Sequence, residues 1–142
     1  MEKLHLISAD TLFYQPLDHP KMLIDGILSN GLAILSGDSK IGKSWMVLWL
    51  CLKISMGEPV WGLPTAQTDV IYLALEDNDW RIQQRMQELI DEPPKNLHFG
   101  FSCGKLGAEL EGQIKGVLED NPNTGLLFID TLQMVRDNVS SR

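Results

Sequence analysis

Cysteine, aromatic residues and long apolar runs are all scarce in this chain of 142 residues. Its two cysteines, Cys51 and Cys103, lie far apart without paired-cysteine spacing, which argues against a disulfide framework or a zinc site and predicts a reducing, cytoplasmic setting. No apolar run reaches the length of a membrane span, and the N-terminal residues lack the apolar core and cleavage site of a signal peptide. We therefore expect a soluble protein with no membrane partner.

Positive charge is also in short supply, since 12 Lys and Arg face 19 Asp and Glu and the formal net charge is −7. This balance opposes a broad basic surface of the kind that holds duplex DNA through its phosphates. It does not exclude DNA as a partner, because a ring-shaped motor needs only a few basic loops along its channel. The length predicts a single domain over residues 1–142, with residues 1–30 as an N-terminal segment across one edge of the core.

Short apolar runs alternate with helical patterns along most of the chain. Strands are predicted over residues 31–37, 70–76, 97–102 and 125–132, and helices over 43–56, 80–90 and 107–119. Gly57 is the expected C-terminal stop of the first of these helices. Strands that alternate with helices of this length predict an α/β fold, with a parallel sheet covered by helices on both faces.

The stretch GDSKIGKS, residues 37–44, matches the P-loop pattern in full. Its glycines let the backbone curl so that N–H groups face phosphates, and the helix that follows adds the positive end of its dipole. The motif follows a predicted strand and opens a predicted helix, a context that a chance glycine-rich turn would lack. We expect Lys43 to reach the β- and γ-phosphates of a bound nucleotide, and Ser44 to hold Mg²⁺. The expected nucleotide-binding residues are Gly37, Asp38, Ser39, Lys40, Ile41, Gly42, Lys43, Ser44 and Trp45.

Two acidic residues end predicted strands. Asp130 follows LLFI, which is the Walker B arrangement, and beside a complete P-loop we interpret it as a second ligand of the metal rather than as the cap of a turn. Glu76 ends VIYLALE in the same way, and is either a solvated residue beside a helix cap or a base that orients the attacking water. We predict that Glu76 and Lys43 are catalytic and that Ser44 and Asp130 bind Mg²⁺.

Several other residues remain open in their interpretation. Arg81 and Arg85 lie four residues apart on one face of a predicted helix. They could contact phosphates or a neighbouring subunit, or they could simply be solvated. Trp45 and Trp49 lie in an almost wholly apolar helix, which favours a place in the core over base stacking. The three histidines show no ligand spacing.

Taken together, GLAILSGDSKIGKS, VIYLALED and LLFIDTLQMV resemble the RecA-like P-loop ATPases, and most closely the RepA-type hexameric helicases and related AAA ATPases of mobile elements. The resemblance implies that Glu76 is the catalytic glutamate, that Asp130 is the Walker B aspartate, and that Gln133 couples the nucleotide to DNA-facing loops. It also implies that ATP hydrolysis with Mg²⁺ is coupled to the unwinding or remodelling of DNA. The expected partners in the complete protein are single-stranded DNA and further copies of the chain in a ring.

A RecA-like core normally continues beyond the Walker B strand, and the resemblance implies that the next strand lies between the P-loop strand and the Walker B strand. We therefore expect a core truncated after the Walker B strand, with a slot in the middle of its sheet. A fragment of a longer ATPase is the favoured explanation. A truncated gene product, a sheet that closes differently and a partner chain in the slot are the alternatives.

Two other functions stay open from the sequence. One is a nucleotide-dependent regulatory or assembly module that binds ATP without productive turnover. The other is a small-molecule P-loop kinase, which the lack of an arginine-rich lid disfavours. DNA-stimulated turnover would distinguish the motor from the module, and a phosphorylated product would identify the kinase.

Overall fold

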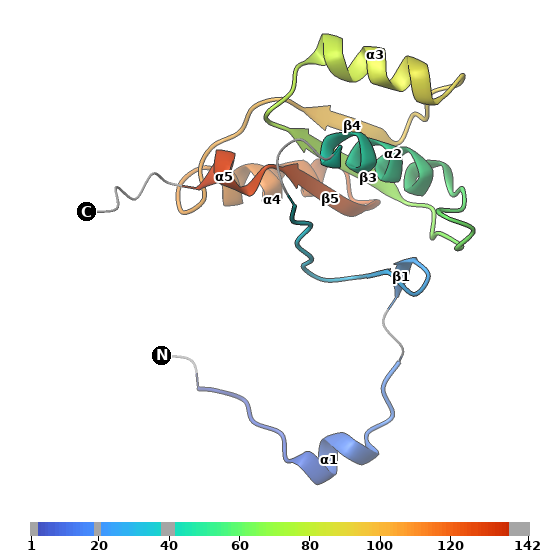
Figure 1. Cartoon of the computed structure of the whole chain (residues 1–142). Helices are drawn as coiled ribbons and strands as arrows, with labels where there is room; N and C mark the ends of the chain where they lie inside the picture. The colour runs from blue at the N-terminus through green and yellow to red at the C-terminus, as the bar shows by residue number, and fades with distance from the viewer. Residues whose placement is uncertain (1–2, 19–20, 38–41, 137–142) are drawn as a thin grey trace.

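The centre of the protein is a three-stranded parallel sheet. The structure is a computed structural model that describes residues 3–18, 21–37 and 42–136. Strands β3 (Asp69–Ala74), β4 (Leu97–Gly100) and β5 (Thr124–Asp130) lie in the order β4–β3–β5, with β3 in the middle (Figure 1). They correspond to the strands predicted over residues 70–76, 97–102 and 125–132. The predicted α/β fold class is confirmed.

Helices cover both faces of this sheet. Helix α2 (Lys43–Met56) lies on one face and α4 (Leu110–Asp120) on the other, while α3 (Asp79–Leu89) lies near β4 and α2 (Figure 1). Successive side chains of a strand point to opposite faces, so Val70, Tyr72 and Ala74 join the core cluster beneath α2. Ile71 and Leu73 point to the side of α4, where they line a cavity.

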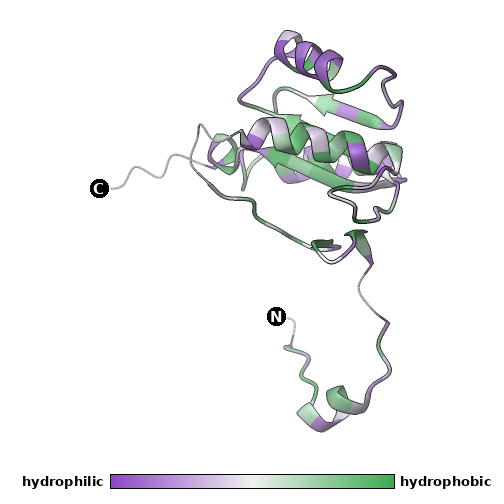
Figure 2. Cartoon of the chain, turned by 45° about the vertical axis from the view of Figure 1, so that its right-hand side comes forward, coloured by the Kyte–Doolittle hydropathy of each residue, from purple (hydrophilic) through white to green (hydrophobic). Residues whose placement is uncertain are grey.

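Helix α2 has the bounds that the sequence predicts, because its signals are local. Gly42 and Gly57 flank it with left-handed backbone, at φ 83° and φ 68°. The N–H of Gly57 donates to the carbonyls of Ile54 and Lys53, which ends the helix as predicted. It contributes a large share of the buried residues of the protein: Val47, Leu48, Leu50, Cys51, Leu52, Ile54 and Ser55. The hydropathy colouring shows α2 and the sheet as mainly hydrophobic and α3 as mainly hydrophilic (Figure 2).

The strand predicted over residues 31–37 is not formed, and that prediction was wrong. These residues are exposed, with Leu32 at 97% and Ile34 at 76%. Among the described residues β5 is hydrogen-bonded only to β3, so its outer edge offers no neighbouring strand. Residues 31–37 therefore lack the backbone partners and the apolar surface that a buried strand requires. The slot expected between a P-loop strand and the Walker B strand is not seen among the described residues, because no P-loop strand forms on its far side and β5 is an edge strand.

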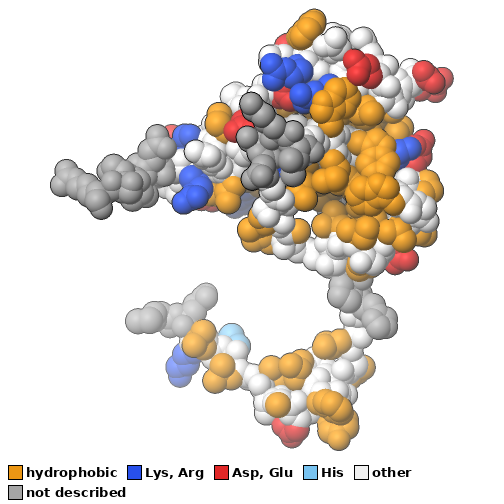
Figure 3. Space-filling view, in the orientation of Figure 1, with side chains coloured by type: hydrophobic (Ala, Val, Ile, Leu, Met, Phe, Trp, Pro, Cys, Tyr) orange, Lys and Arg blue, Asp and Glu red, His pale blue; other side chains and the backbone are white. Residues whose placement is uncertain are grey.

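The N-terminal part of the chain carries elements that were not predicted. Strands β1 (Met22–Ile24) and β2 (Leu28–Ser29) form a hairpin, and Leu23 and Ile24 are buried there. The hairpin is joined to the rest of the fold by the N–H of Asp25, which donates to the carbonyl of Pro64 at 2.9 Å. Helix α1 (Ala9–Tyr14) extends away from the sheet, and this segment exposes hydrophobic side chains (Figures 1 and 3). None of the helices within the described ranges is long and apolar enough to cross a membrane.

Candidate nucleotide-binding site

The two ends of the P-loop meet at the start of α2. Gly42 has φ 83°, a backbone conformation that residues with a Cβ rarely adopt, and it is the N-cap of the helix. The ammonium group of Lys43 donates to the carbonyl of Gly37, so this side chain reaches back across the loop. The predicted residues Asp38, Ser39, Lys40 and Ile41 lie outside the described residues. The first turn of α2 carries no acidic side chain, which keeps the positive end of the helix dipole available for an anion.

Ser44 and Asp130, the two residues expected to bind Mg²⁺, lie in contact. The hydroxyl of Ser44, in the first turn of α2, donates to Oδ2 of Asp130 at 2.8 Å. The same carboxylate oxygen accepts a hydrogen bond of 3.0 Å from the hydroxyl of Tyr72. The sequence analysis did not predict a role for Tyr72. The feature that could have indicated one is a single tyrosine in an otherwise aliphatic strand. Burial and the nearby charge of Asp130 raise the pKa of Tyr72, so its hydroxyl stays protonated and remains a donor.

Glu76 lies beside this pair. It lies two residues beyond the end of β3, and its Oε1 accepts a hydrogen bond of 3.1 Å from the hydroxyl of Thr131, the residue after Asp130. The N–H of Leu75 donates to the carbonyl of Asp130 at 2.9 Å, which joins the ends of β3 and β5. The contact of Thr131 with Glu76 was not predicted, since only the strand register brings the two residues together.

The oxygen donors of the site suit Mg²⁺. This ion is usually bound through one or two carboxylates, together with substrate phosphates and water, rather than by a complete protein cage. Ser44 and Asp130 supply a hydroxyl and a carboxylate within hydrogen-bond distance of each other. Across the described part of the chain, no group of three or more His, Cys, Asp or Glu residues could hold a metal ion. The pair therefore fits a magnesium ion that arrives with a nucleotide, and does not resemble a self-sufficient metal site.

Comparison with known families agrees with this geometry. The family AAA_25, described as an AAA domain, matches residues 2–142. The chain belongs to this AAA domain family. Membership places it among the AAA and P-loop ATPases, which bind nucleotides. Neither the curated proteins nor the solved structures contain a match to the chain.

Two arginines of α3 in this AAA domain share one acidic partner. Arg85 and Arg81 both approach the carboxylate of Asp77, which follows Glu76. Trp49 packs against the core as predicted, whereas Trp45 keeps 37% of its surface exposed and was wrongly placed in the core. Gln133 lies exposed on the short helix α5 (Leu132–Val135), just beyond Asp130.

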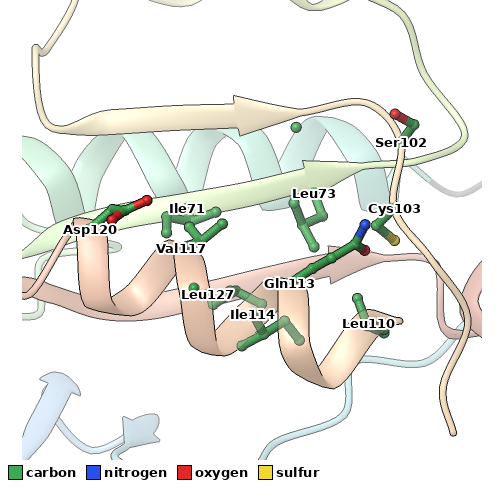
Figure 4. Close-up of a pocket in the computed structure, with 12 residues that line it drawn as sticks. Ile71, Leu73, Ser102, Cys103, Leu110, Gln113, Ile114, Val117, Asp120 and Leu127 are labelled. Carbon is green, nitrogen blue, oxygen red and sulfur yellow. The ribbon is translucent and has the colours of Figure 1, made fainter. Parts of the chain in front are cut away.

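A cavity of about 440 Å³ lies on the other face of the sheet of this AAA domain. Ile71 and Leu73 of β3 line it together with Leu110, Gln113 and Val117 of α4 (Figure 4). Because β3 separates this space from α2, the cavity is distinct from the P-loop and the acidic strand ends.

Proposed function

We propose that this AAA domain binds ATP with Mg²⁺ and hydrolyses it. The observation that carries the proposal is the meeting of three predicted residues at one end of the sheet: Ser44 contacts Asp130, and Thr131 joins Asp130 to Glu76. A hydroxyl in the first turn of a P-loop helix, beside a strand-end carboxylate, is the arrangement that P-loop ATPases use to hold the metal of a nucleotide. Glu76 lies at the same carboxyl ends of the strands, where it accepts the hydrogen bond from Thr131.

Each residue has a distinct proposed role. Lys43 and the loop from Gly37 to Gly42 hold the phosphates, and the Trp45 backbone extends the positive end of α2. Ser44 and Asp130 would hold Mg²⁺, which when bound supplies positive charge at the β- and γ-phosphate oxygens. Glu76 orients the water that attacks the γ-phosphate and accepts its proton, while Thr131 holds the Glu76 carboxylate in place.

We further propose that the chain is an ATPase domain of the RepA type, acting in a ring of copies on single-stranded DNA. Two features support this step: the order and spacing of the three motifs, and Gln133, which is exposed one short turn beyond Asp130. The acidic net charge of −7 requires any DNA contacts to come from local basic loops.

Tryptophan fluorescence against Mg-ATP tests the proposal, because Trp45 follows Ser44 directly. We expect a saturable change in the wild type that is lost in Lys43→Ala, and binding without turnover in Glu76→Gln. No response from a wild-type protein that is folded by circular dichroism would refute nucleotide binding. Binding without turnover in the wild type would instead identify a regulatory or assembly module. Turnover that does not rise with single-stranded DNA would argue against the RepA-type role.

A further inference from the structure

Asp77 and Arg85 form a largely buried ion pair directly behind Glu76. One guanidinium nitrogen of Arg85 donates to Oδ2 of Asp77 at 2.6 Å, and the two side chains keep only 16% and 7% of their surface exposed. Arg81 approaches the other oxygen of Asp77 at 3.3 Å, but its side chain is 51% exposed. The two arginines therefore contact the same carboxylate, but the Arg85 side chain is largely buried and the Arg81 side chain is largely exposed.

Arg85 also contacts the first turn of the P-loop helix. Its guanidinium carbon lies 5.1 Å from the centre of the Trp45 ring, a distance at which a cation is attracted by the aromatic face. Trp45 is the neighbour of Ser44, and Asp77 is the neighbour of Glu76. The Arg85 side chain thus connects the turn that contains Glu76, the candidate catalytic acid, with the helical turn that contains Ser44, the candidate metal ligand.

The chemistry of arginine suits such a bridge. Its planar guanidinium has five donors, so it can bond a carboxylate at its edge while its face lies on an aromatic ring. A lysine ammonium has no flat face and could satisfy only one of these two contacts fully. The Arg85 guanidinium already contacts both Asp77 and the Trp45 ring within the domain. This favours a structural role at the site over direct binding of phosphate.

We propose that Arg85 is a positioning residue, which fixes the Glu76 turn against the first turn of α2. This inference rests on the proposed function. Within the described residues Arg85 makes its ion pair with Asp77 and its cation–π contact with Trp45, whereas phosphate binding is assigned to Lys43 and the loop backbone. We therefore expect the affinity for the ground-state nucleotide to depend little on Arg85. The alignment of Glu76 depends on the turn that Asp77 anchors, so stabilisation of the transition state requires Arg85.

The experiment compares Arg85→Ala, Arg85→Lys and Arg81→Ala in the whole chain. For each variant we would measure the affinity for ADP and for ADP with aluminium fluoride, which mimics the phosphoryl group in transfer, together with kcat where turnover is measurable. Arg85→Ala should weaken binding of the mimic about tenfold or more while ADP affinity changes less than about twofold. Arg85→Lys should recover part of the loss, and Arg81→Ala should match the wild type.

A double-mutant cycle separates positioning from simple loss of a contact. Asp77→Asn should weaken mimic binding as Arg85→Ala does, and the double variant should be little worse than either single one, since both changes break the same pair. Equal losses for ADP and the mimic, or losses that follow the melting temperature, would overturn the proposal. Failure of the wild type to bind ADP would contradict the proposed function itself. If Arg85→Ala instead prefers ADP with aluminium fluoride over ADP as strongly as the wild type does, only the role of Arg85 would be contradicted.

Discussion

Ser44 and Asp130 lie 86 residues apart in the sequence and are joined by a hydrogen bond of 2.8 Å. The contact connects the first turn of the P-loop helix with the C-terminal end of β5. It depends on the sheet, because the parallel register pairs Ala74 of β3 with Asp130 and so sets the level at which the carboxylate leaves the strand. Tyr72, two residues earlier in β3, donates to the same oxygen and holds it in that position. The site is thus assembled by strand register as much as by the P-loop motif.

The charge of Asp130 can be tested with Asp130→Asn. The amide keeps the size of the side chain but loses the negative charge that favours Mg²⁺, and it offers only one acceptor oxygen to Ser44 and Tyr72. We expect the Mg²⁺ concentration for half-maximal turnover to rise by about tenfold or more, because a hydrogen bond or contact to a charged group contributes about 1.5–3 kcal/mol. A titration of turnover with Mg²⁺ at fixed ATP measures this shift.

Asp69→Asn is the matched control, because Asp69 begins β3 at the end of the sheet away from the site. Its Mg²⁺ dependence should equal that of the wild type. An unchanged Mg²⁺ requirement in Asp130→Asn would exclude Asp130 as a metal ligand.

The hydrogen bond from Thr131 to Glu76 predicts a change in turnover without a change in affinity. Thr131→Val keeps the shape of the side chain and removes the 3.1 Å donor to Glu76. We expect kcat to fall by about fivefold to tenfold, in line with the loss of one hydrogen bond of about 1–1.5 kcal/mol, while the dissociation constant for ATP stays unchanged. Thr124→Val is the control, since the Thr124 hydroxyl has no hydrogen-bond partner among the described residues. Parallel losses in affinity and kcat would show that Thr131 acts on binding instead.

Local signals made part of this fold predictable from the sequence. Helix α2 has the predicted bounds, because an apolar run between Gly42 and Gly57 is enough to define it. Residues 31–37 have an equally apolar sequence but form no strand, since a strand exists only where a neighbour supplies hydrogen bonds. The apolar pattern of a segment indicates what it can pair with, but not whether a partner is present.

The candidate site divides in a similar way. Lys43, Ser44, Glu76 and Asp130 follow from motifs, because each residue type stands at a fixed distance from a strand or glycine. Tyr72 and Thr131 reach their partners across 58 and 55 residues of sequence, through a register that no motif encodes. Arg85 contacts Asp77 eight residues away, which the spacing of exposed helical charges did not reveal.

The buried hydroxyl of Tyr72 predicts a loss of stability in alkali. Its pKa in the folded protein is raised by burial and by the Asp130 charge, whereas in the unfolded chain it is about 10. Above that pH the unfolded chain releases a proton that the folded protein retains, so the free energy of unfolding decreases as pH rises further. Tyr72→Phe should flatten this decrease between about pH 9.5 and 11.5, as measured by denaturant unfolding at several pH values.

Tyr14→Phe is the control for this experiment, because Tyr14 is the other tyrosine and is 81% exposed. It should leave the alkaline slope unchanged. Equal slopes for Tyr72→Phe and the wild type would mean that the Tyr72 hydroxyl is solvated in solution.

The contrast between Leu48 and Leu32 tests both the core and the unformed strand. Leu48 is 0% exposed in the middle of α2, so Leu48→Ala should leave a cavity and lower the free energy of unfolding by about 2–5 kcal/mol. Leu32 is 97% exposed in the segment that forms no strand, and Leu32→Ala should change the free energy of unfolding by less than about 0.5 kcal/mol. Urea unfolding of the two variants measures both values. A loss of several kcal/mol in Leu32→Ala would contradict the exposed placement, and would mean that residues 31–37 pair as a buried strand in solution.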